Sequence, residues 1–332
     1  MESRLYWEQL KSGTIATAQP NCNGKTLGKM LLPIPPKAEQ SRLVQKLANF
    51  TPIFQRYAKA QQDLDNLNKS IDDKLKKSIL QEAIQGRLVP QITEEGTAQE
   101  LLEQIKQEKL HLLKEGKLKK SALVDSVIYK GDDNKYYEQV GKSDKEITEE
   151  IAFDLPNGWS WCRLKDICSI FTGATFKKEE TVTTKEGVRI LRGGNISPFE
   201  LRIKDDDIFL TKDKVKEDII LKENDILTPA VTSLENIGKM VRVNSDMPNT
   251  TVGGFVFIIR LYLKNQWLSK YILYLLSSPF MIDFMKSITN KSGQAFYNIG
   301  KERLSTALLP IPSLAEQHRI VAQIEKLFEQ LR

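Results

Sequence analysis

The stretch LLPIPPKAEQSRLV, from Leu31 to Val44, returns near the end of the chain as LLPIPSLAEQHRIV, from Leu308 to Val321. Ten of the seventeen positions in residues 31–47 are identical to those in residues 308–324. In both copies an apolar segment ends in Pro-Ile-Pro, and proline keeps the residue before it out of the helical region. Ala-Glu-Gln follows, and then an apolar pattern of helical period begins. Each copy is therefore predicted to be a strand-to-helix junction, and ten identities disfavour chance similarity between two helix starts.

The composition allows a packed fold and points weakly to a polyanionic partner. The chain has 332 residues, enough for one large domain or two ordinary ones, and 40% of them are hydrophobic. The formal net charge is +6. Residues 155–312 contain 22 Lys and Arg against 17 Asp and Glu, whereas residues 37–154 contain 20 against 21. The basic excess of the later segment suits a polyanionic partner, and a net charge of this size is weak evidence by itself.

Cysteine usage and hydropathy indicate a reduced, cytoplasmic setting. Cys22, Cys162 and Cys168 are three in number and lack CxxC spacing, which argues against a disulfide framework or a zinc site. The N-terminus has no charged-then-apolar signal pattern, and no apolar run approaches the roughly 18 residues that a membrane helix needs. We expect a soluble protein that is not exported and does not contact a membrane.

A long helix is predicted to follow the first junction. Its apolar residues recur at steps of three and four and form one stripe, heptad-like in its centre. Pro52 is expected to kink the helix or to restart it with Thr51 as cap, and Gly86 and Pro90 are expected to end it. A partner helix, antiparallel or coiled-coil, is favoured over packing on an ordinary core. The predicted helix-packing residues are Tyr57, Leu64, Leu67, Ile71, Leu75 and Ile79.

The segment between the long helix and the later domain is strongly charged. Thr97 and Glu100 have the spacing of a capping box and predict a helix that runs to about Lys114. Residues 117–150 are polar, with the strings KGDDNK and GKSDKE, and are expected to form an exposed linker.

From residue 151 the pattern is that of an α+β domain. Short β-rich runs such as VRILRGGNI, NDILTPAV and GGFVFIIRL are separated by Gly, Asn and Pro, and NQWLSKYILYLLSSPFMIDFMKSI predicts one or two amphipathic helices. The first thirty residues parallel the end of this domain in their order of helix end, Ser/Gly loop, Gln, Asn, Gly-Lys and strand. We therefore expect a globular α+β domain combined with long, coiled-coil-like helices.

The sequence offers no constellation for catalysis, and we predict no catalytic residue, no metal ligand and no cofactor. NGKT, from Asn23 to Thr26, resembles the end of a phosphate-binding loop, but position 19 is Gln where that loop needs Gly. The acidic run from Asp205 to Asp207 is interpreted as a solvated turn at a strand edge, in preference to a metal site. A cryptic nuclease or methyltransferase is the disfavoured enzyme alternative.

Several segments together resemble the DNA-specificity subunit of type I restriction–modification enzymes. These are the two junctions, LKKSILQEAIQGRLVPQ at residues 75–91, ELLEQIKQEK at residues 100–109, LPNGWSWCRLKDI at residues 155–167, and TGATFKK at residues 172–178. The resemblance covers essentially the whole chain. The set is specific, although no single motif is.

The resemblance implies a non-catalytic DNA reader in a bacterial defence system. In this family two target-recognition domains each bind half of a split site in double-stranded DNA. Two long helices pack antiparallel, hold these domains at a fixed spacing and dock methyltransferase subunits, and a restriction subunit can join. The methyl donor and the nucleotide belong to those partners.

The chain departs from the family pattern in its extent. Residues 1–36 look like the C-terminal remnant of a first recognition domain, 37–90 like the central helix, 91–150 like a charged helix and linker, 151–312 like a complete recognition domain, and 313–332 like the start of a second long helix. A half-length reader that forms a homodimer through the long helix is one expectation. A truncated or silent fragment, or a helical interaction scaffold without DNA binding of its own, is the alternative.

Base reading needs donors and acceptors on loops, with cations that anchor phosphates. Such residues lie in four loops of the later domain, and the adjacent glycines of LRGGN would let the backbone approach DNA. For each residue a solvated turn is the alternative. The candidate DNA-binding residues are Thr172, Lys177, Lys178, Arg192, Asn195, Thr232, Ser233, Asn236, Lys239, Lys291, Ser292, Gln294 and Tyr297.

Overall fold

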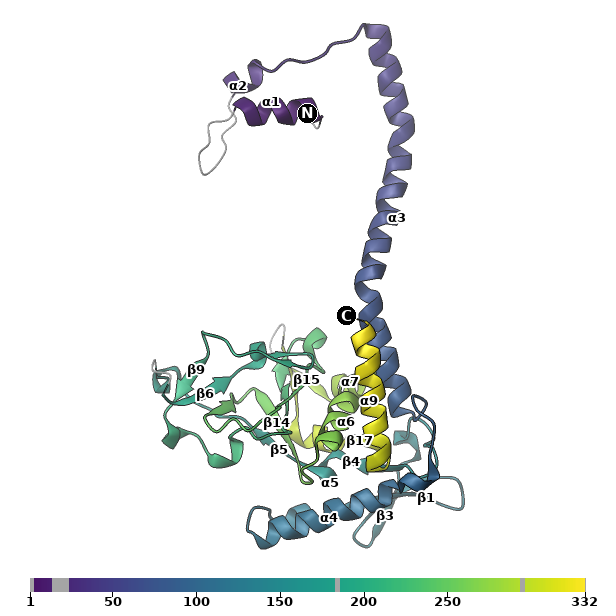
Figure 1. Cartoon of the computed structure of the whole chain (residues 1–332), viewed down its shortest axis with the longest axis vertical. Coiled ribbons are helices and arrows are strands. Elements are labelled where there is room, and N and C mark those ends of the chain that lie inside the picture. Colours follow the sequence, from purple (N-terminus) through teal and green to yellow (C-terminus); the bar gives the residue numbers. More distant parts are fainter. Residues whose placement is uncertain (1–2, 14–23, 183–185, 293–295, 332) are drawn as a thin grey trace. The chain divides into compact units, whose positions relative to one another are not determined.

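A computed structural model describes residues 3–13, 24–182, 186–292 and 296–331. It divides into two compact units, Met1–Ser70 (unit 1) and Ile71–Arg332 (unit 2). Unit 1 holds the helices α1 (Arg4–Gly13) and α2 (Gly24–Gly28) and most of the long helix α3 (Lys37–Ile84), whose last turns belong to unit 2 (Figure 1). Within the described residues no helix combines the length and the apolar character needed to cross a membrane.

Helix α3 is continuous through Pro52. The prediction of a restart at Thr51 is wrong, and the kink stays a prediction. The Thr51 hydroxyl donates to the carbonyl of Leu47 at 2.8 Å, one turn back inside the helix, so Thr51 is not a cap. Proline removes a single backbone donor, and the long helical segments on either side keep the helix intact. At about 1.5 Å per residue, the 48 residues of α3 span about 72 Å.

The end of α3 follows the predicted glycine signal. Gly86 adopts φ +70°, its N–H donates to the carbonyl of Ala83, and the N–H of Arg87 donates to the carbonyl of Glu82. These two bonds form a Schellman motif, which satisfies the last helical carbonyls and turns the chain. Gly86 also lies against Pro156, which a side chain at this position would strike.

The predicted apolar stripe of α3 divides into two parts. Ile79 packs against the core of unit 2, and its neighbours Leu80, Ala83 and Ile84 are buried there. The other five stripe residues are exposed, and for them a partner helix stays a prediction. These residues are Tyr57, Leu64, Leu67, Ile71 and Leu75.

The repeated phrase begins a helix in both copies. After the second copy, α9 (Leu314–Gln330) is capped by the Ser313 hydroxyl, which accepts from the N–H of Glu316. The Gln317 amide donates to the carbonyl of Pro312 at 3.1 Å, and in the first copy the Gln40 amide donates to the carbonyl of Pro35 at 2.8 Å. The glutamine of Ala-Glu-Gln thus closes the turn after Pro-Ile-Pro in both copies.

The strand half of the junction forms only in the second copy. Strand β17 (Leu308–Ile311) pairs antiparallel with β4 (Ser160–Arg163), and its residues are buried. In the first copy, the expected strand at residues 31–35 is wrong for the described part of the chain. The Gln9 side chain bonds the N–H of Leu31 at 2.7 Å and its carbonyl at 3.0 Å, in the place where a partner strand would bond. A strand needs a neighbouring strand, which the local sequence cannot supply by itself.

The segment 91–150 forms a helix and a small sheet. Helix α4 (Ala98–Lys114) begins at Thr97, whose side chain accepts from the N–H of Glu100, as predicted. The linker prediction for residues 117–150 is wrong. Strands β1 (Ser126–Lys130), β2 (Tyr136–Val140) and β3 (Ser143–Glu146) form an antiparallel sheet in the order β1-β2-β3. Its inner face packs with Trp161 and Leu308, which explains how so polar a segment becomes ordered.

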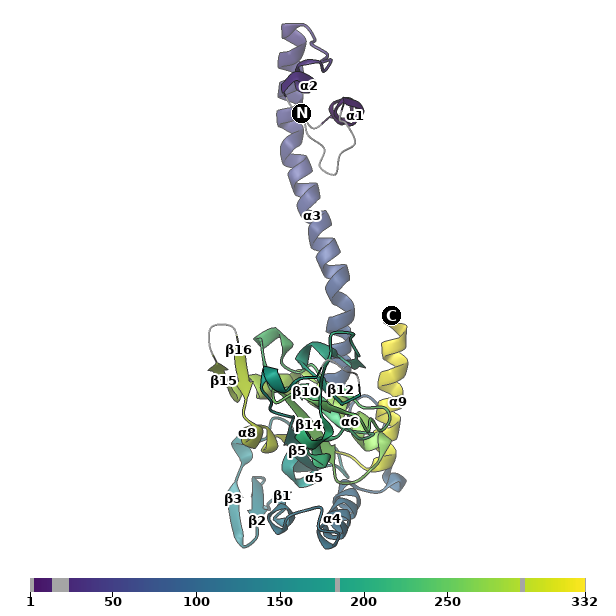
Figure 2. The same cartoon turned by 90° about the vertical axis from the view of Figure 1, so that its left-hand side faces the viewer.

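The rest of unit 2 is an α+β fold, as predicted (Figures 1 and 2). Its largest sheet has the order β12-β10-β14-β5 and is antiparallel. A second sheet places β6 between β9 and β13, and a third has the order β11-β16-β15. Helices α6 and α9 contact each other beside the core. The elements are α5 (Leu164–Ile167), β5 (Cys168–Thr172), β6 (Val188–Leu191), β7 (Ile196–Ser197), β8 (Glu200–Leu201), β9 (Ile208–Leu210), β10 (Ile226–Pro229), β11 (Val231–Thr232), β12 (Val241–Arg242), β13 (Thr250–Val252), β14 (Val256–Leu261), α6 (Gln266–Leu276), α7 (Pro279–Ser287), β15 (Thr289–Ser292), β16 (Phe296–Ile299) and α8 (Lys301–Ser305).

Glu316, from the second junction, accepts hydrogen bonds from two other segments of unit 2. Its carboxylate accepts from the Trp159 indole at 3.0 Å and from the Gln91 amide at 2.8 Å. Burial raises the pKa of Glu316 above 4.5, and these two hydrogen bonds only partly oppose the rise. The residue is therefore a place where the stability of unit 2 depends on pH.

Replacing Glu316 with glutamine is expected to make the free energy of unfolding less sensitive to pH. A carboxyl whose pKa is raised by folding holds its proton more tightly in the native state, so its contribution is present below about pH 4.5 and is lost as the pH rises through the folded pKa. The wild type should lose stability relative to the variant as the pH is raised from about 4.5 toward neutrality. Urea unfolding across this range measures the difference, and a difference that grows with pH in favour of the wild type would contradict the assignment.

Candidate nucleic-acid interface

Three loops leave unit 2 where the strands β5, β10 and β14 begin or end side by side. We call this end of the four-stranded sheet its loop edge. In the antiparallel register Pro229, at the end of β10, lies opposite Val256, at the start of β14, and Thr172, at the end of β5, lies opposite Phe257. The segments 173–187, 230–240 and 253–255 therefore begin or end side by side. Two of them carry candidate residues, and Thr172, Lys177 and Lys178 are exposed there.

A hairpin joins this edge through backbone pairing. Thr232 of β11 lies opposite Tyr297 of β16, and the N–H of Ile299 donates to the carbonyl of Ala230 at 2.9 Å. Lys291, on the neighbouring strand β15, is opposite Tyr297 and exposed. The fold thus brings together two candidate loops that are about sixty residues apart in the sequence.

The glycine loop after β6 lies beside the same edge. A Cβ atom at Gly193 would stand 3.8 Å from the side chain of Pro229, and one at Gly194 would stand 3.3 Å from the ammonium group of Lys204. The Arg192 guanidinium is exposed and bonds the Asp206 carboxylate at 3.1 Å. Four sequence-predicted groups of residues therefore meet at one end of unit 2.

Asn195 is a correction to the predicted contacts. It is 1% exposed, and its amide donates to the Asp207 carboxylate at 2.6 Å and to the Arg202 carbonyl at 2.9 Å. Its side-chain oxygen accepts from the N–H of Arg192 at 2.7 Å. With these bonds made and the side chain buried, Asn195 shapes the loop and is not placed to read a base.

Asp205 and Asp206 are exposed, as the interpretation of a solvated turn requires, but the third residue of the acidic run differs. Asp207 is buried and its carboxylate bonds the Arg189 guanidinium at 2.9 Å and the N–H of Lys204. Burial by itself would raise the pKa of Asp207, but these bonds and the one from Asn195 hold it below its usual value. No group of three or more His, Cys, Asp and Glu side chains suited to a metal occurs among the described residues.

The remaining candidates vary in their exposure. Thr232 is buried, whereas Lys239 and Tyr297 are half-buried. The Ser233 hydroxyl donates to Glu235 and accepts from Asn236, each at 2.8 Å, so these polar groups are preorganised by each other. The side chain of Ser292 and the whole of Gln294 lie outside the described residues.

Two exposed aromatic residues at this edge were not among the predicted contacts. Phe255, just before β14, is 73% exposed, and its carbonyl accepts from the N–H of Ala230 at 2.8 Å. Phe296, at the start of β16, is 56% exposed. The signal that could have found Phe255 is its place after two glycines at the start of a strand. Phenylalanine can contact thymine methyl groups or wedge between base steps.

Comparisons with known proteins agree on one family. A sequence model of the type I restriction modification DNA specificity domain matches residues 156–332. The EcoAI specificity subunit of a type I restriction enzyme from Escherichia coli is 30% identical over 301 residues, which cover 85% of this chain and 44% of that protein. The EcoEI specificity subunit, also from Escherichia coli, is 26% identical over 286 residues, 85% of this chain and 45% of that protein.

A solved structure is similar in fold. It comes from work on the structural basis underlying complex assembly and conformational transition of the type I R-M system. It aligns with a TM-score of 0.50 at 17% identity, covering 99% of this chain and 62% of that one. The chain spans less than half the length of the EcoAI and EcoEI specificity subunits.

Proposed function

Because the chain belongs to the family of type I restriction–modification DNA specificity subunits, we propose that unit 2 reads one half of a bipartite site in double-stranded DNA. The recognition domain would be the segment 151–312 together with the small sheet that packs on it. The protein itself would be non-catalytic, and methylation and cleavage would belong to its partner subunits.

The convergence of four loops at one end of the sheet carries this proposal. A DNA reader needs exposed cations for phosphates and several hydrogen-bonding or apolar groups for base edges, all on one rigid surface. Lys177, Lys178 and Lys291 supply exposed cations, and Ser233 and Asn236 supply donors and acceptors. Phe255 and Phe296 add apolar contacts. The sheet beneath fixes the loops relative to one another.

The helices are proposed as the docking elements for the methyltransferase subunits, with the restriction subunit joining the assembly. The exposed stripe of α3, which includes Tyr57, Leu64 and Leu67, supports this role, because a helix with an exposed apolar stripe calls for a protein partner. The same observation supports two finer proposals, a homodimer through α3 and a helical scaffold that acts without DNA binding. DNA binding by the purified chain separates the scaffold from the reader.

Salt dependence of duplex binding tests the function. The full chain is expected to bind duplex DNA with a logarithmic slope against salt of about −0.9 per phosphate contact. Substituting Lys239→Ala and Lys291→Ala together should weaken binding to all sequences and reduce the slope by about two, if each lysine neutralises one phosphate. Fluorescence anisotropy from about 50 to 200 mM salt measures both quantities.

A matched control for the two lysines is Lys142→Ala, in the turn between β2 and β3. This residue is exposed and belongs to a different part of unit 2, so its removal should leave the slope unchanged. A protein whose duplex affinity does not depend on salt would contradict the proposed function.

Gly193→Ala tests whether the glycine loop brings its backbone close to DNA. The added methyl meets only the Pro229 side chain, at an ordinary contact distance of 3.8 Å, so the fold should tolerate it. A methyl group pushed into a packed DNA contact costs about 1–3 kcal/mol, which corresponds to a loss of affinity of roughly 5- to 150-fold. Unchanged thermal unfolding with weaker duplex binding is the expected pair of results. Unchanged binding would place this backbone away from the DNA.

A further inference from the structure

The outer face of the β1-β2-β3 sheet has the composition of a binding surface. Side chains alternate across a strand, so Val127, Tyr129, Tyr137 and Gln139 share this face, and Tyr129 lies opposite Tyr137 in the register. We call these four residues the tyrosine face. Val127 is 50% exposed and Tyr129 is 41% exposed.

The two tyrosine rings form a platform. Their centroids are 5.8 Å apart with an interplanar angle of 26°, a stacked arrangement. Gly131, in the turn between the strands, makes room for it, because a Cβ atom there would stand 3.1 Å from the Tyr137 ring and 2.8 Å from the Asp133 carboxylate. The turn thus holds a carboxylate beside the platform.

Carboxylates surround the platform on two sides. The Tyr137 hydroxyl donates to Asp133 at 2.7 Å. Glu146 lies opposite Tyr137, and Asp144 lies opposite Gln139, both on β3. The ammonium group of Lys135 bonds Glu146 at 3.0 Å, so three carboxylates face one cation. The surface is therefore aromatic and negatively charged.

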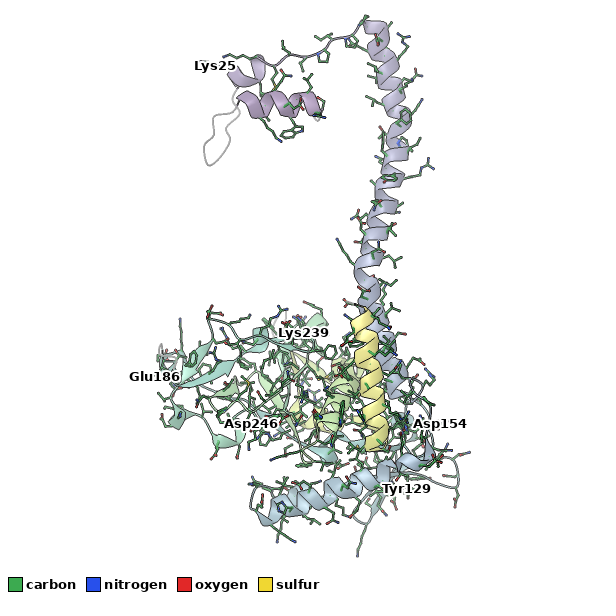
Figure 3. All side chains as sticks on the ribbon, viewed as in Figure 1. Lys25, Tyr129, Asp154, Glu186, Lys239 and Asp246 are labelled. Atoms are coloured by element: carbon green, nitrogen blue, oxygen red, sulfur yellow. The ribbon has the colours of Figure 1, made fainter. Side chains whose placement is uncertain are left out.

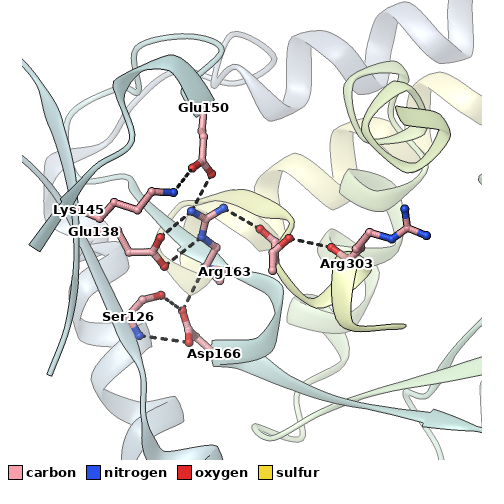
Figure 4. Close-up of polar contacts among 8 residues, drawn as sticks. Ser126, Glu138, Lys145, Glu150, Arg163, Asp166 and Arg303 are labelled. Atoms are coloured by element: carbon pink, nitrogen blue, oxygen red, sulfur yellow. Dashed lines mark hydrogen bonds and ion pairs between the residues drawn. The ribbon is translucent and has the colours of Figure 1, made fainter. Parts of the chain in front are cut away.

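The inner face makes this surface rigid. Glu138 on β2 bonds the Arg163 guanidinium at 2.6 Å, and the hydroxyl and N–H of Ser126 on β1 bond Asp166 at 2.6 and 3.3 Å (Figure 4). Ile128, which shares the inner face, is buried. A preorganised surface loses little conformational entropy when it binds.

The tyrosine face is unsuited to DNA. Its net negative charge repels phosphates. Tyr129 also lies at the opposite end of unit 2 from Lys239, which belongs to the candidate DNA loops (Figure 3), and strands β1 to β3 occupy that far end in both ribbon views (Figures 1 and 2). A protein partner of positive charge fits this surface better.

We propose that the tyrosine face binds a protein segment that lays an arginine side chain across Tyr129 and Tyr137. A guanidinium is planar, stacks on aromatic rings and bonds carboxylates with a fork of donors, whereas an ammonium is a compact, strongly hydrated charge. Unit 2 already uses this geometry inside itself. The Arg260 guanidinium lies 5.3 Å from the centroid of the Phe171 ring and bonds both oxygens of Asp225 at 2.7 Å. The tyrosine face presents the aromatic and carboxylate half of the same arrangement to a partner.

The inference rests on the proposed function, because that function supplies the protein partner used in the test. It is the methyltransferase subunit of the same system, and the arginine would come from a surface segment of that subunit. The proposed occupant of the tyrosine face is therefore a protein. Binding of DNA at this face would contradict the inference.

The experiment measures the affinity of the full chain for the methyltransferase subunit by calorimetry and for duplex DNA by anisotropy. Tyr129→Ala with Tyr137→Ala should weaken methyltransferase binding roughly tenfold or more, as loss of a desolvated cation–π contact does, and leave duplex affinity unchanged. Tyr129→Phe with Tyr137→Phe keeps the rings and should retain most of the affinity. Asp144→Lys keeps both rings, places a cation beside them and should weaken methyltransferase binding as well.

The outcomes separate this inference from the proposed function. Methyltransferase binding that is intact in both the alanine and the lysine variants would overturn the inference alone. A loss of duplex affinity in the alanine variant would assign the face to DNA and would also overturn it. A wild-type chain that binds DNA but not the methyltransferase subunit would overturn the proposed docking and this inference together. Lys142→Ala is the matched surface control, and thermal unfolding of each variant verifies its fold.

Discussion

Replacing Arg163 with methionine is expected to lower the free energy of unfolding of unit 2 by about 3–5 kcal/mol. Arg163 is buried, and its guanidinium donates to Glu138 at 3.1 and 2.6 Å, to Glu150 at 2.8 Å and to the carbonyl of Thr306 at 2.8 Å (Figure 4). Methionine fills most of the volume but leaves Glu138 as an uncompensated buried charge. Chemical denaturation monitored by tryptophan fluorescence measures the change.

An exposed pair provides the control for Arg163. Arg202 bonds Glu200 at 2.6 Å, but both side chains are more than half exposed, so Arg202→Met should cost less than about 1 kcal/mol. Adding Glu138→Met to the Arg163 variant removes the unpaired carboxylate and should restore part of the lost stability. If the Arg163 and Arg202 variants lose equal stability, the buried network does not hold the β1-β2-β3 sheet.

Replacing Gly173 with alanine is expected to cost about 2–3 kcal/mol and to impair DNA binding at the same time. A Cβ atom at Gly173 would stand 2.2 Å from the carbonyl oxygen of Val252 and 2.4 Å from that of Gly253, and backbone atoms cannot yield as a flexible side chain does. The loop that carries Lys177 must then move away from the sheet edge. Denaturation and duplex anisotropy on the same sample measure both effects.

Gly253, whose carbonyl oxygen lies close to Gly173, provides a control for the loss of backbone flexibility. At Gly253 an added Cβ would meet its nearest neighbours, in Ile190 and Leu191, at 3.6 and 3.8 Å, which are ordinary contact distances. Gly253→Ala should therefore fold and bind nearly as the wild type does. Equal losses in the two variants would show that backbone freedom, and not the close approach at Gly173, is what the edge requires.

The sequence was a good guide where local chemistry decides the structure. The Thr97 cap, the Gly86 helix end and the helix starts at Ala-Glu-Gln all depend on residues within a few positions of one another, and all of them form as the sequence predicts. The bond by which each Gln closes its turn was found only in the structure. The α+β character of residues 151–312 was likewise clear from short apolar runs between glycines and prolines.

The sequence-based predictions were wrong where contacts between distant parts of the chain determine the structure. Residues 117–150 look like an exposed linker, but Arg163 and Asp166 bind polar groups of this segment from another part of the chain. The segment 31–35 matches a strand that forms only when a partner strand lies beside it. Asn195 was predicted to contact a base, but the loop that ends at Asp207 buries it. This burial depends on tertiary packing, which the local sequence does not show. The exposure of Phe255 could not be predicted, because the same apolar residue types occur at the exposed start of a strand and in its buried part.

Unit 2 is proposed above all to read a DNA sequence. Selection from a pool of random duplexes by the full chain, alone and with the methyltransferase subunit, tests it most directly. We expect one short sequence to be enriched in at least one of the two conditions, and Gly173→Ala to abolish the enrichment. Folded wild-type protein that enriches no sequence in either condition would contradict the claim.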